Sequence, residues 1–425
     1  MTERQETGAQ DRPAAEGATA IWSVEKPTEA PATAEPLEPQ DPEPENEAGP
    51  RLLLLGTDDA GEELTVALQR LGAEVMTADA ETLTDAEELT AVLVSLQPDF
   101  VVTRTDAVVF GALEAFESAE GQDVEWVPSL RAARLIADRE GLRRHAADEL
   151  GLPTAPFWFV DSLAELEAVA AHAGFPLLVK PVAGPSGQGR SVVRTPEEVA
   201  PAWERAGRGG RVWAETVVDV EFLVTLIVVR SEGPSGPVIE FCSPIGHRSN
   251  GADGLESWQP QQMSTAALDA AKSIAARIVK SLGGRGVFGV ELMINGDEVY
   301  FSEVAAGPSD SAWVTLRSQR LSAFELQARA ILGVAVDTMM VSPGAARVIT
   351  RGPSAPGAAP SGDLLAAALA VPESDVRVFD PAASAGSDAA PPSWGLALAT
   401  APELAVARDR ARQVAARLNV RDSRA

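Results

Sequence analysis

The stretch FPLLVKPVAGPSGQGR, residues 175–190, sets the expected fold. It opens with a short apolar run, Leu177–Val179, and places Lys180, one of only four lysines in the chain, directly after that run. A cation in such apolar surroundings is costly unless an anion meets it. The glycines that follow let backbone N–H groups approach a phosphate closely. The pattern is typical of a strand and loop that grip a nucleoside triphosphate, and also of a strand end with a plain surface turn.

Composition limits the classes of protein that the chain can belong to. A length of 425 residues predicts two or three domains with a sizeable core, and the net charge of −27 disfavours nucleic acid and anionic membranes as partners. Cys242 is the only cysteine and there are three histidines, which excludes an internal disulfide and disfavours a thiolate or multi-histidine metal site. Without an apolar run of membrane-spanning length or a signal-peptide pattern, we expect a soluble cytoplasmic protein.

The first half of the chain divides by composition. Residues 1–50 are acidic and rich in proline and alanine, so we expect a disordered tail. From Arg51 the pattern alternates between apolar strands and amphipathic helices, which predicts a parallel α/β domain over residues 51–150. The first strand-to-helix turn, GTDDAG, carries Asp58 and Asp59 where a pyrophosphate would lie in a dinucleotide-binding domain. This disfavours NAD and allows a ligand that bears an amine.

The spacing of apolar residues predicts further strands and helices along the chain. We expect strands at 157–160 and 376–379, two strands about a bend over 212–230, and helices at 85–96, 138–150, 163–173, 265–282, 362–369 and 402–418. The polar segment GHRSNGADGLESWQPQQ, residues 246–262, is expected to be a long loop.

A hairpin that carries two glutamates is the second informative segment. Asn295-Gly296 is a turn signal between two apolar strands, and Glu291 and Glu303 lie on either side of it. A loop of odd length would place both carboxylates on one face of the sheet, where they repel each other unless a divalent cation lies between them. Oxygen ligands suit Mg²⁺. A loop of even length would place them on opposite faces, as two solvated strand residues.

Several longer strings carry a resemblance to a known family. REGLRRHAADELGLPT (139–154), ESWQPQQMS (256–264) and GGRGVFGVELMINGDEVYFSEV (283–304) resemble the formate-dependent phosphoribosylglycinamide formyltransferases, which belong to the ATP-grasp superfamily. The resemblance covers roughly residues 51–420. It implies an α/β (α+β) ATP-grasp fold, with an N-terminal domain at 51–150, an ATP-grasp domain at 151–345 whose lid spans about 151–225, and a C-terminal domain at 346–425. It also implies a homodimer, with ATP and Mg²⁺ as cofactors and with formate and glycinamide ribonucleotide as substrates.

The resemblance assigns roles to individual residues. It implies that Lys180 and Arg139 contact the ATP phosphates as catalytic residues, and that Glu291 and Glu303 hold Mg²⁺. The remaining implied contacts are a phosphate-covering loop (Pro185, Ser186, Gly187, Gln188, Gly189 and Arg190), an adenine pocket (Glu215, Thr216, Val217 and Val218) and an amine site (Asp59, Ala60 and Asp310).

The chain departs from the family pattern at several of these places. It has Gln188 in place of a loop lysine, Leu223 in place of a ribose-binding glutamate, Arg104 in place of a glutamate and Gly307 in place of an arginine. No basic residue lies between Arg377 and Arg408, where the family holds the ribose phosphate with a lysine and two arginines. Three functions follow from this pattern: the formyltransferase, an ATP-grasp ligase for a different amine, or a catalytically reduced binding or scaffold protein.

Overall fold

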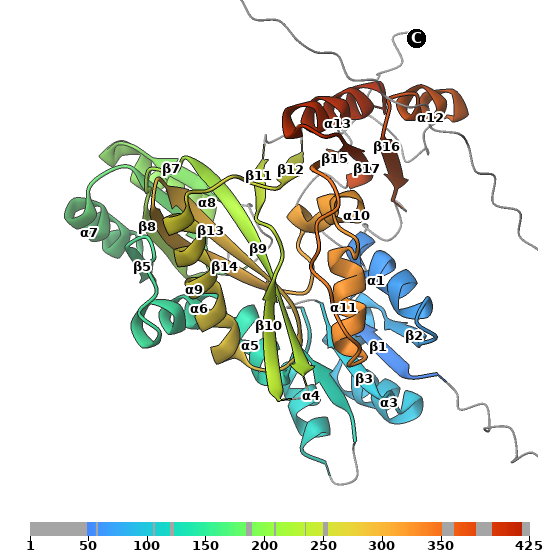
Figure 1. Cartoon of the computed structure of the whole chain (residues 1–425). Helices are drawn as coiled ribbons and strands as arrows, with labels where there is room; N and C mark the ends of the chain where they lie inside the picture. The colour runs from blue at the N-terminus through green and yellow to red at the C-terminus, as the bar shows by residue number, and fades with distance from the viewer. Residues whose placement is uncertain are drawn as a thin grey trace, which may run out of the picture. The chain divides into compact units, whose positions relative to one another are not determined.

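The structure, a computed structural model (Figure 1), describes ten segments of the chain. These are residues 49–56, 58–104, 107–119, 123–183, 189–207, 210–233, 235–249, 254–350, 361–379 and 393–418. The predicted tail and Pro185, Ser186, Gly187 and Gln188 therefore lie outside the described residues.

The first sheet is parallel and confirms the predicted α/β arrangement at the start of the chain. Its order is β2 (Glu74–Ala78), β1 (Arg51–Leu55), β3 (Phe100–Thr103) and β4 (Glu125–Val127). Its helices are α1 (Asp59–Gln69), α2 (Ala80–Thr84), α3 (Ala86–Leu96), α4 (Phe110–Glu117) and α5 (Leu130–Ala137). The leucines of β1 are fully buried because helices cover both faces of the sheet. Asp58 caps α1 by accepting a hydrogen bond from Gly61 N, so the start of α1 is fixed at the carboxyl edge of the sheet.

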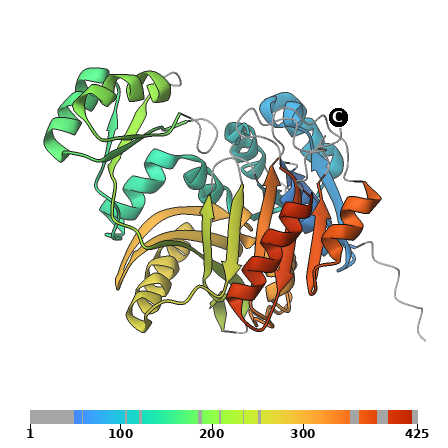
Figure 2. The ribbon, with the colours of Figure 1, turned by 90° about the horizontal axis from the view of Figure 1, so that it is seen from above.

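A small antiparallel sheet follows the linker helices α6 (Arg139–Arg144) and η1 (His145–Glu149). Its order is β5 (Phe157–Val160), β8 (Val212–Thr216), β6 (Leu177–Pro181) and β7 (Ser191–Val193). Helices α7 (Leu163–Ala173) and α8 (Val199–Ala206), with the short η2 (Pro196–Glu198), bury one face of it. In Figure 2 these green elements stand to one side of the larger sheet. This unit falls in residues 151–225, where the resemblance implies a lid, and we refer to it as the lid; Lys180 lies near the end of its β6 strand.

The third sheet is the largest and joins the middle of the chain to its C-terminal part. Its order is β14 (Glu298–Ala306), β13 (Gly286–Asn295), β9 (Phe222–Gly233), β11 (Ile245–Ser249), β12 (Leu255–Gln259), β15 (Gly344–Thr350), β17 (Ser393–Thr400) and β16 (Ser374–Val378), with β10 (Gly236–Phe241) also paired to β9. Its helices are α9 (Thr265–Leu282), η5 (Asp310–Val314), α10 (Thr315–Ser318), α11 (Ala323–Ile331), α12 (Gly362–Leu369) and α13 (Leu404–Leu418).

Two cores hold this sheet from opposite faces. Val224, Leu226 and Leu292 point toward α9, whereas Ile227 and Val229 point toward η5 and α11. The alternation follows from the period of two along a strand. The predicted boundary between residues 345 and 346 falls inside β15, which pairs with β12 and β17. The division into domains stays a prediction.

The predicted loop at 246–262 is wrong, because most of it forms the antiparallel pair β11–β12. Several of its polar side chains, among them Glu256, Ser257 and Gln259, are buried and not solvated as a loop would require. Glu256 is 1% exposed, and its carboxylate bonds Arg248 Nε and Arg408 Nε at 2.9 Å each. Arg408 also lies over the Trp258 ring at 3.8 Å. The buried polar groups find partners in distant segments, and a local hydropathy pattern does not record such partners.

The predicted helices at 163–173, 265–282 and 362–369 are confirmed to the residue. The helix expected over 138–150 forms as two parts, α6 and the π-helical turn η1. No helix among the described residues has the length and apolarity that a membrane crossing requires.

We expect Glu256→Gln to lower the free energy of unfolding at pH 7 by about 2 kcal/mol, because two arginines then lose a buried charged partner. Burial would raise the pKa of the Glu256 carboxyl, but Arg408 and Arg248 hold it below its usual value. Its stabilisation is therefore present above that usual value and is lost as the pH falls through the lowered pKa. Urea unfolding at pH 7 and pH 4 measures both effects. The exposed Glu167→Gln is the control, and equal losses in the two variants would contradict the role of Glu256.

Candidate active site

Lys180 is placed by the strand that the sequence predicted. Leu177 and Val179 are buried in the lid core, and the side chain of Lys180 is 27% exposed. Its Nζ lies 3.1 Å from Glu215 Oε1 and 3.7 Å from the centroid of the Trp213 ring. Burial lowers the pKa of Lys180, while the Glu215 carboxylate opposes that shift. The cation is thus fixed by an anion and an aromatic face, as its apolar surroundings require.

Arg143 is a second cation at the same carboxylate, and the sequence analysis did not single it out. Its side chain is 2% exposed. One guanidinium nitrogen bonds Glu215 Oε2 at 3.2 Å, and another donates to the Phe301 carbonyl at 3.1 Å. The guanidinium also lies over the Trp213 ring at 4.6 Å. Glu215 therefore joins α6, the lid strand β6 and, through Arg143, the strand β14.

Glu291 and Glu303 stand directly opposite each other on β13 and β14. The last pair of the hairpin is Asn295 with Glu298, so the turn has an even length, which on its own would separate the two carboxylates. A bulge restores the pairing, because Leu292 pairs with Phe301 and Ser302 is left as the extra residue. Both side chains consequently project from the same face of the sheet.

The two carboxylates lie in a strained electrostatic setting. Burial, the charge of Glu303 and the charge of Asp310 raise the pKa of Glu291 to about 7, and Lys180 opposes this shift. Burial also raises the pKa of Asp310, as does the charge of Asp58, whereas Arg104 lowers it. Asp310 nevertheless keeps contact with solvent. Glu303, Glu291 and Asp310 thus form a row of carboxylates that repel one another, and Lys180 and Arg104 are the cations that act on this row. A divalent cation bound among the carboxylates would reduce their repulsion.

The donor set fits Mg²⁺ only if the nucleotide contributes ligands. Among the described residues, no group of three or more histidine, cysteine or acidic side chains is placed to hold a metal ion. Mg²⁺ is commonly held by one or two carboxylates together with substrate phosphates and water. Glu291 and Glu303 supply two carboxylates, and Lys180 lies near enough to lower the pKa of Glu291.

We expect the metal-free protein to become more stable on Glu291→Gln at pH 8 and to show no difference at pH 4. A carboxyl whose folded pKa is raised contributes stability below its usual pKa, and this contribution is lost as the pH rises through about 7. The uncharged amide avoids the loss, which should amount to about 1–3 kcal/mol. Unfolding in EDTA at the two pH values measures it. A difference that does not change with pH would show that Glu291 is not destabilised by its ionisation.

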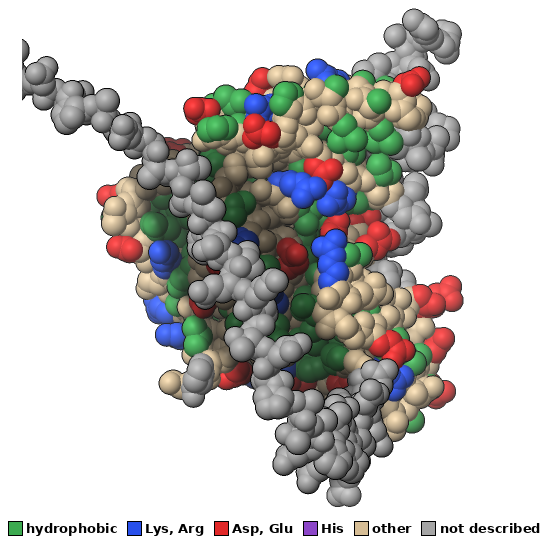
Figure 3. Space-filling model, turned by 45° about the vertical axis from the view of Figure 1, so that its right-hand side comes forward, with side chains coloured by type: hydrophobic (Ala, Val, Ile, Leu, Met, Phe, Trp, Pro, Cys, Tyr) green, Lys and Arg blue, Asp and Glu red, His purple; other side chains and the backbone are tan. Residues whose placement is uncertain are grey.

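The other predicted residues lie on α6, β8 and α1 and in the segments directly after β8 and directly before β7. Arg139 begins α6 and is half-buried, Glu215 and Thr216 end β8, and Asp59 and Ala60 begin α1. Val217 is 42% exposed directly after β8, and Val218 is half-buried. Gly189 has a φ of +70°, and Arg190 beside it is exposed. Leu223 is 37% exposed at the start of β9. Figure 3 shows acidic and basic side chains next to one another around a hollowed part of the face in view.

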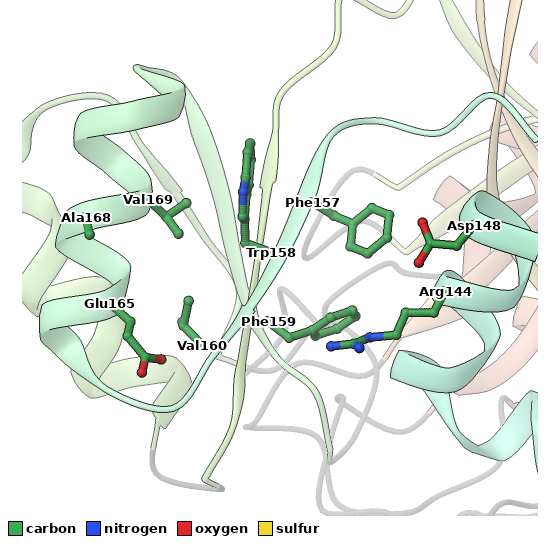
Figure 4. A pocket seen from close by; sticks show the side chains of 9 residues that line it. All are labelled: Arg144, Asp148, Phe157, Trp158, Phe159, Val160, Glu165, Ala168 and Val169. Atoms are coloured by element: carbon green, nitrogen blue, oxygen red, sulfur yellow. The ribbon is translucent and has the colours of Figure 1, made fainter. Parts of the chain in front are cut away.

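A hollow of about 530 Å³ lies at the edge strand β5, whose Phe157 pairs with Glu215 of β8. Figure 4 shows Phe157 and Phe159 pointing to one side of the strand, toward Arg144 and Asp148. Trp158 points to the other side, toward α7. None of the predicted site residues lines this hollow.

Comparison with known proteins identifies the class and then the family. Residues 145–324 match the model of the ATP-grasp domain, so the fold is that of an ATP-grasp protein. A protein of Mycolicibacterium gilvum named formate-dependent phosphoribosylglycinamide formyltransferase is 45% identical over 393 residues, covering 87% of this chain and 96% of that protein. One of Paraburkholderia xenovorans with the same name is 44% identical over 395 residues and covers 88% and 96%. The chain belongs to the formate-dependent phosphoribosylglycinamide formyltransferase family.

Two solved structures support the fold. One, described as glycinamide-RNase-transformylase T from Mycobacterium tuberculosis, is 60% identical with a TM-score of 0.74, covering 87% of this chain and all of that one. A carboxyaminoimidazole ribonucleotide synthase from Aspergillus clavatus, 22% identical, has a TM-score of 0.73 over 88% of this chain and all of its own. The second comparison bears on the fold alone.

Proposed function

We propose that this protein forms formyl phosphate from formate and ATP and transfers the formyl group to the amine of glycinamide ribonucleotide. The observation that carries this proposal is the pairing of Glu291 with Glu303 on one face of the sheet. Lys180 lies near enough to lower the pKa of Glu291. The name shared by relatives at 44–45% identity supports the choice of substrates.

The chemistry has two balanced steps. A formate oxygen attacks the γ-phosphorus of ATP and ADP leaves, because formate needs a better leaving group than oxide. The amine nitrogen then attacks the formyl carbon, the phosphate departs with the former formate oxygen, and the amine loses a proton. Mg²⁺, held by Glu291 and Glu303, would neutralise charge on the phosphates. The protein contributes position and charge rather than covalent chemistry.

Individual side chains have distinct roles in this proposal. Lys180 and Arg139 contact the ATP phosphates, and the loop Pro185–Arg190 covers them. Glu215, Thr216, Val217 and Val218 line the adenine. Because Glu215 holds Lys180 at 3.1 Å in the structure, phosphate binding would draw the lysine toward a stronger anion and free a carboxylate oxygen for the adenine amine. Asp59, Ala60 and Asp310 face the amine substrate.

We further propose a cytoplasmic homodimer that acts on small molecules only. Its domains would be those expected from the sequence: 51–150, 151–345 with a lid at about 151–225, and 346–425. Size-exclusion chromatography with light scattering tests the dimer, for which a monomer mass would count against the proposal.

A ligase for a different amine is the second candidate, and one observation favours it. Arg377, a basic residue of the strand β16, already bonds Glu63 Oε1 at 3.1 Å and Asp375 Oδ2 at 2.8 Å. A cation engaged in this way is less available to a ribose phosphate. ADP release on adding ATP, Mg²⁺, formate and glycinamide ribonucleotide supports the main proposal. Turnover only with another amine supports the ligase, and failure to bind ATP would leave a binding or scaffold role.

A further inference from the structure

Arg104 reaches across from the first sheet to the loop that follows Glu303. It comes directly after β3, at the carboxyl edge of the parallel sheet. One terminal nitrogen of its guanidinium, NH1, lies 3.3 Å from the position that a Cβ at Gly307 would take. Gly307 has a φ of +86°, which disfavours any side chain there. The arginine therefore fills the space from which a side chain at position 307 would project.

Asp58 fixes the orientation of this guanidinium. Arg104 Nε lies 3.3 Å from Asp58 Oδ1, and NH2 lies 3.1 Å and 3.2 Å from the two carboxylate oxygens. The Arg104 side chain is 6% exposed. This two-sided pairing uses one edge of the planar group and turns the NH1 end toward the loop at Gly307.

Arg104 also lies within electrostatic reach of the carboxylates of the candidate active site. Arg104 lowers the pKa of Asp310 while Asp58 raises it, so the three groups lie within electrostatic reach of one another. Asp310 is on η5, directly beyond the Gly307 loop. Arg104 thus lowers the pKa of Asp310 at one end of the row of carboxylates, and Lys180 lowers the pKa of Glu291 in the same row.

A small carboxylate that approaches this acidic row needs a cation of its own. In the proposed reaction Lys180 serves the phosphates of ATP, which leaves formate without a partner among the residues assigned so far. The planar guanidinium edge matches a carboxylate better than an ammonium does. The family resemblance leads one to expect an arginine at 307 and a glutamate at 104, and the structure places a guanidinium nitrogen of residue 104 beside the point where a side chain at 307 would begin.

We propose that Arg104, whose guanidinium lies beside Gly307, binds the carboxylate of formate. This inference rests on the proposed function, since it names the anion site of that reaction. It makes Arg104 a substrate-binding and specificity-determining residue, and Asp58 the positioning residue that holds it.

Binding of [¹³C]formate to the protein with Mg²⁺ and ADP tests the inference without turnover. We expect line broadening of the formate signal with the wild type, none with Arg104→Gln, and an intermediate effect with Arg104→Lys, which keeps the charge and loses the planar edge. Arg134→Gln, which breaks an exposed pair with Glu114, is the matched control and should bind as the wild type does. Equal broadening in the wild type and Arg104→Gln, or none in the wild type, overturns the inference.

Steady-state kinetics adds a second readout. Arg104→Gln should raise the KM for formate about tenfold or more, the loss expected for one charge-assisted pair, and leave the KM for ATP unchanged. A rise in the KM for the amine in place of that for formate assigns Arg104 to the acceptor and overturns the inference. Thermal unfolding of each variant separates lost binding from lost folding. A wild type that binds formate through Arg104 but makes no product contradicts the proposed function and leaves the binding site standing.

Discussion

Lys180→Ala should lower kcat/KM for ATP by on the order of a thousandfold, the largest effect expected from any single substitution in the lid. In the proposed function the ammonium group contacts the ATP phosphates, and its pKa is already lowered by burial. A phosphate charge would compensate that burial better than Glu215 does alone. Initial rates of ADP release at varied ATP measure the effect.

Lys280→Ala, on the exposed side of α9, is the control for this variant. Because Lys180 also contacts Glu215 and Trp213, its removal affects the lid as well as the ligand. Lys180→Met keeps the apolar part of the side chain and should fold as the wild type does while remaining inactive. Wild-type turnover in a folded Lys180→Met protein would show that the lysine is not needed for the reaction.

Glu303→Gln should raise the Mg²⁺ concentration needed for half-maximal rate and lower kcat. We expect the ratio of kcat to that Mg²⁺ concentration to fall by about a hundredfold. The substitution removes one of the two carboxylates that face each other across β13 and β14. A titration of the rate with Mg²⁺ at fixed ATP measures the change. Glu298→Gln, on the exposed end of the same strand, is the control. An unaltered Mg²⁺ titration in Glu303→Gln would mean that the metal is held elsewhere.

The sequence was sufficient for those parts of the site that depend on one strand. Lys180 follows an apolar run, and this run forms the buried part of β6, in which Lys180 is the residue before the last. The periodic helices at 163–173 and 265–282 were placed for the same reason, because their burial pattern repeats within one element.

The glutamate pair shows the limit of local reasoning. An odd-length loop was the condition for a shared face, and the actual turn is even. The bulge at Ser302 corrects the register, and nothing in the local spacing marks that residue as extra. The two carboxylates share a face although the turn is not of the expected length, and the metal site stays a prediction.

Contacts between distant segments account for what the sequence analysis missed. Arg143 lies on α6 and finds Glu215 and the Phe301 carbonyl far along the chain. Glu256 is paired in the same way with Arg408, which is why a buried strand was expected to be a loop. At Arg104 the charge reversal was visible in the sequence, but its position beside Gly307 required the fold.

The central claim is that formate is activated as an acyl phosphate and passed to the amine of glycinamide ribonucleotide. The most direct test supplies [¹⁸O]formate with ATP, Mg²⁺ and glycinamide ribonucleotide and examines the inorganic phosphate by mass spectrometry. We predict that each phosphate released carries one formate oxygen and that the ribonucleotide gains one formyl group for each ADP. Phosphate without the label, or ADP release that does not depend on glycinamide ribonucleotide, would contradict the account.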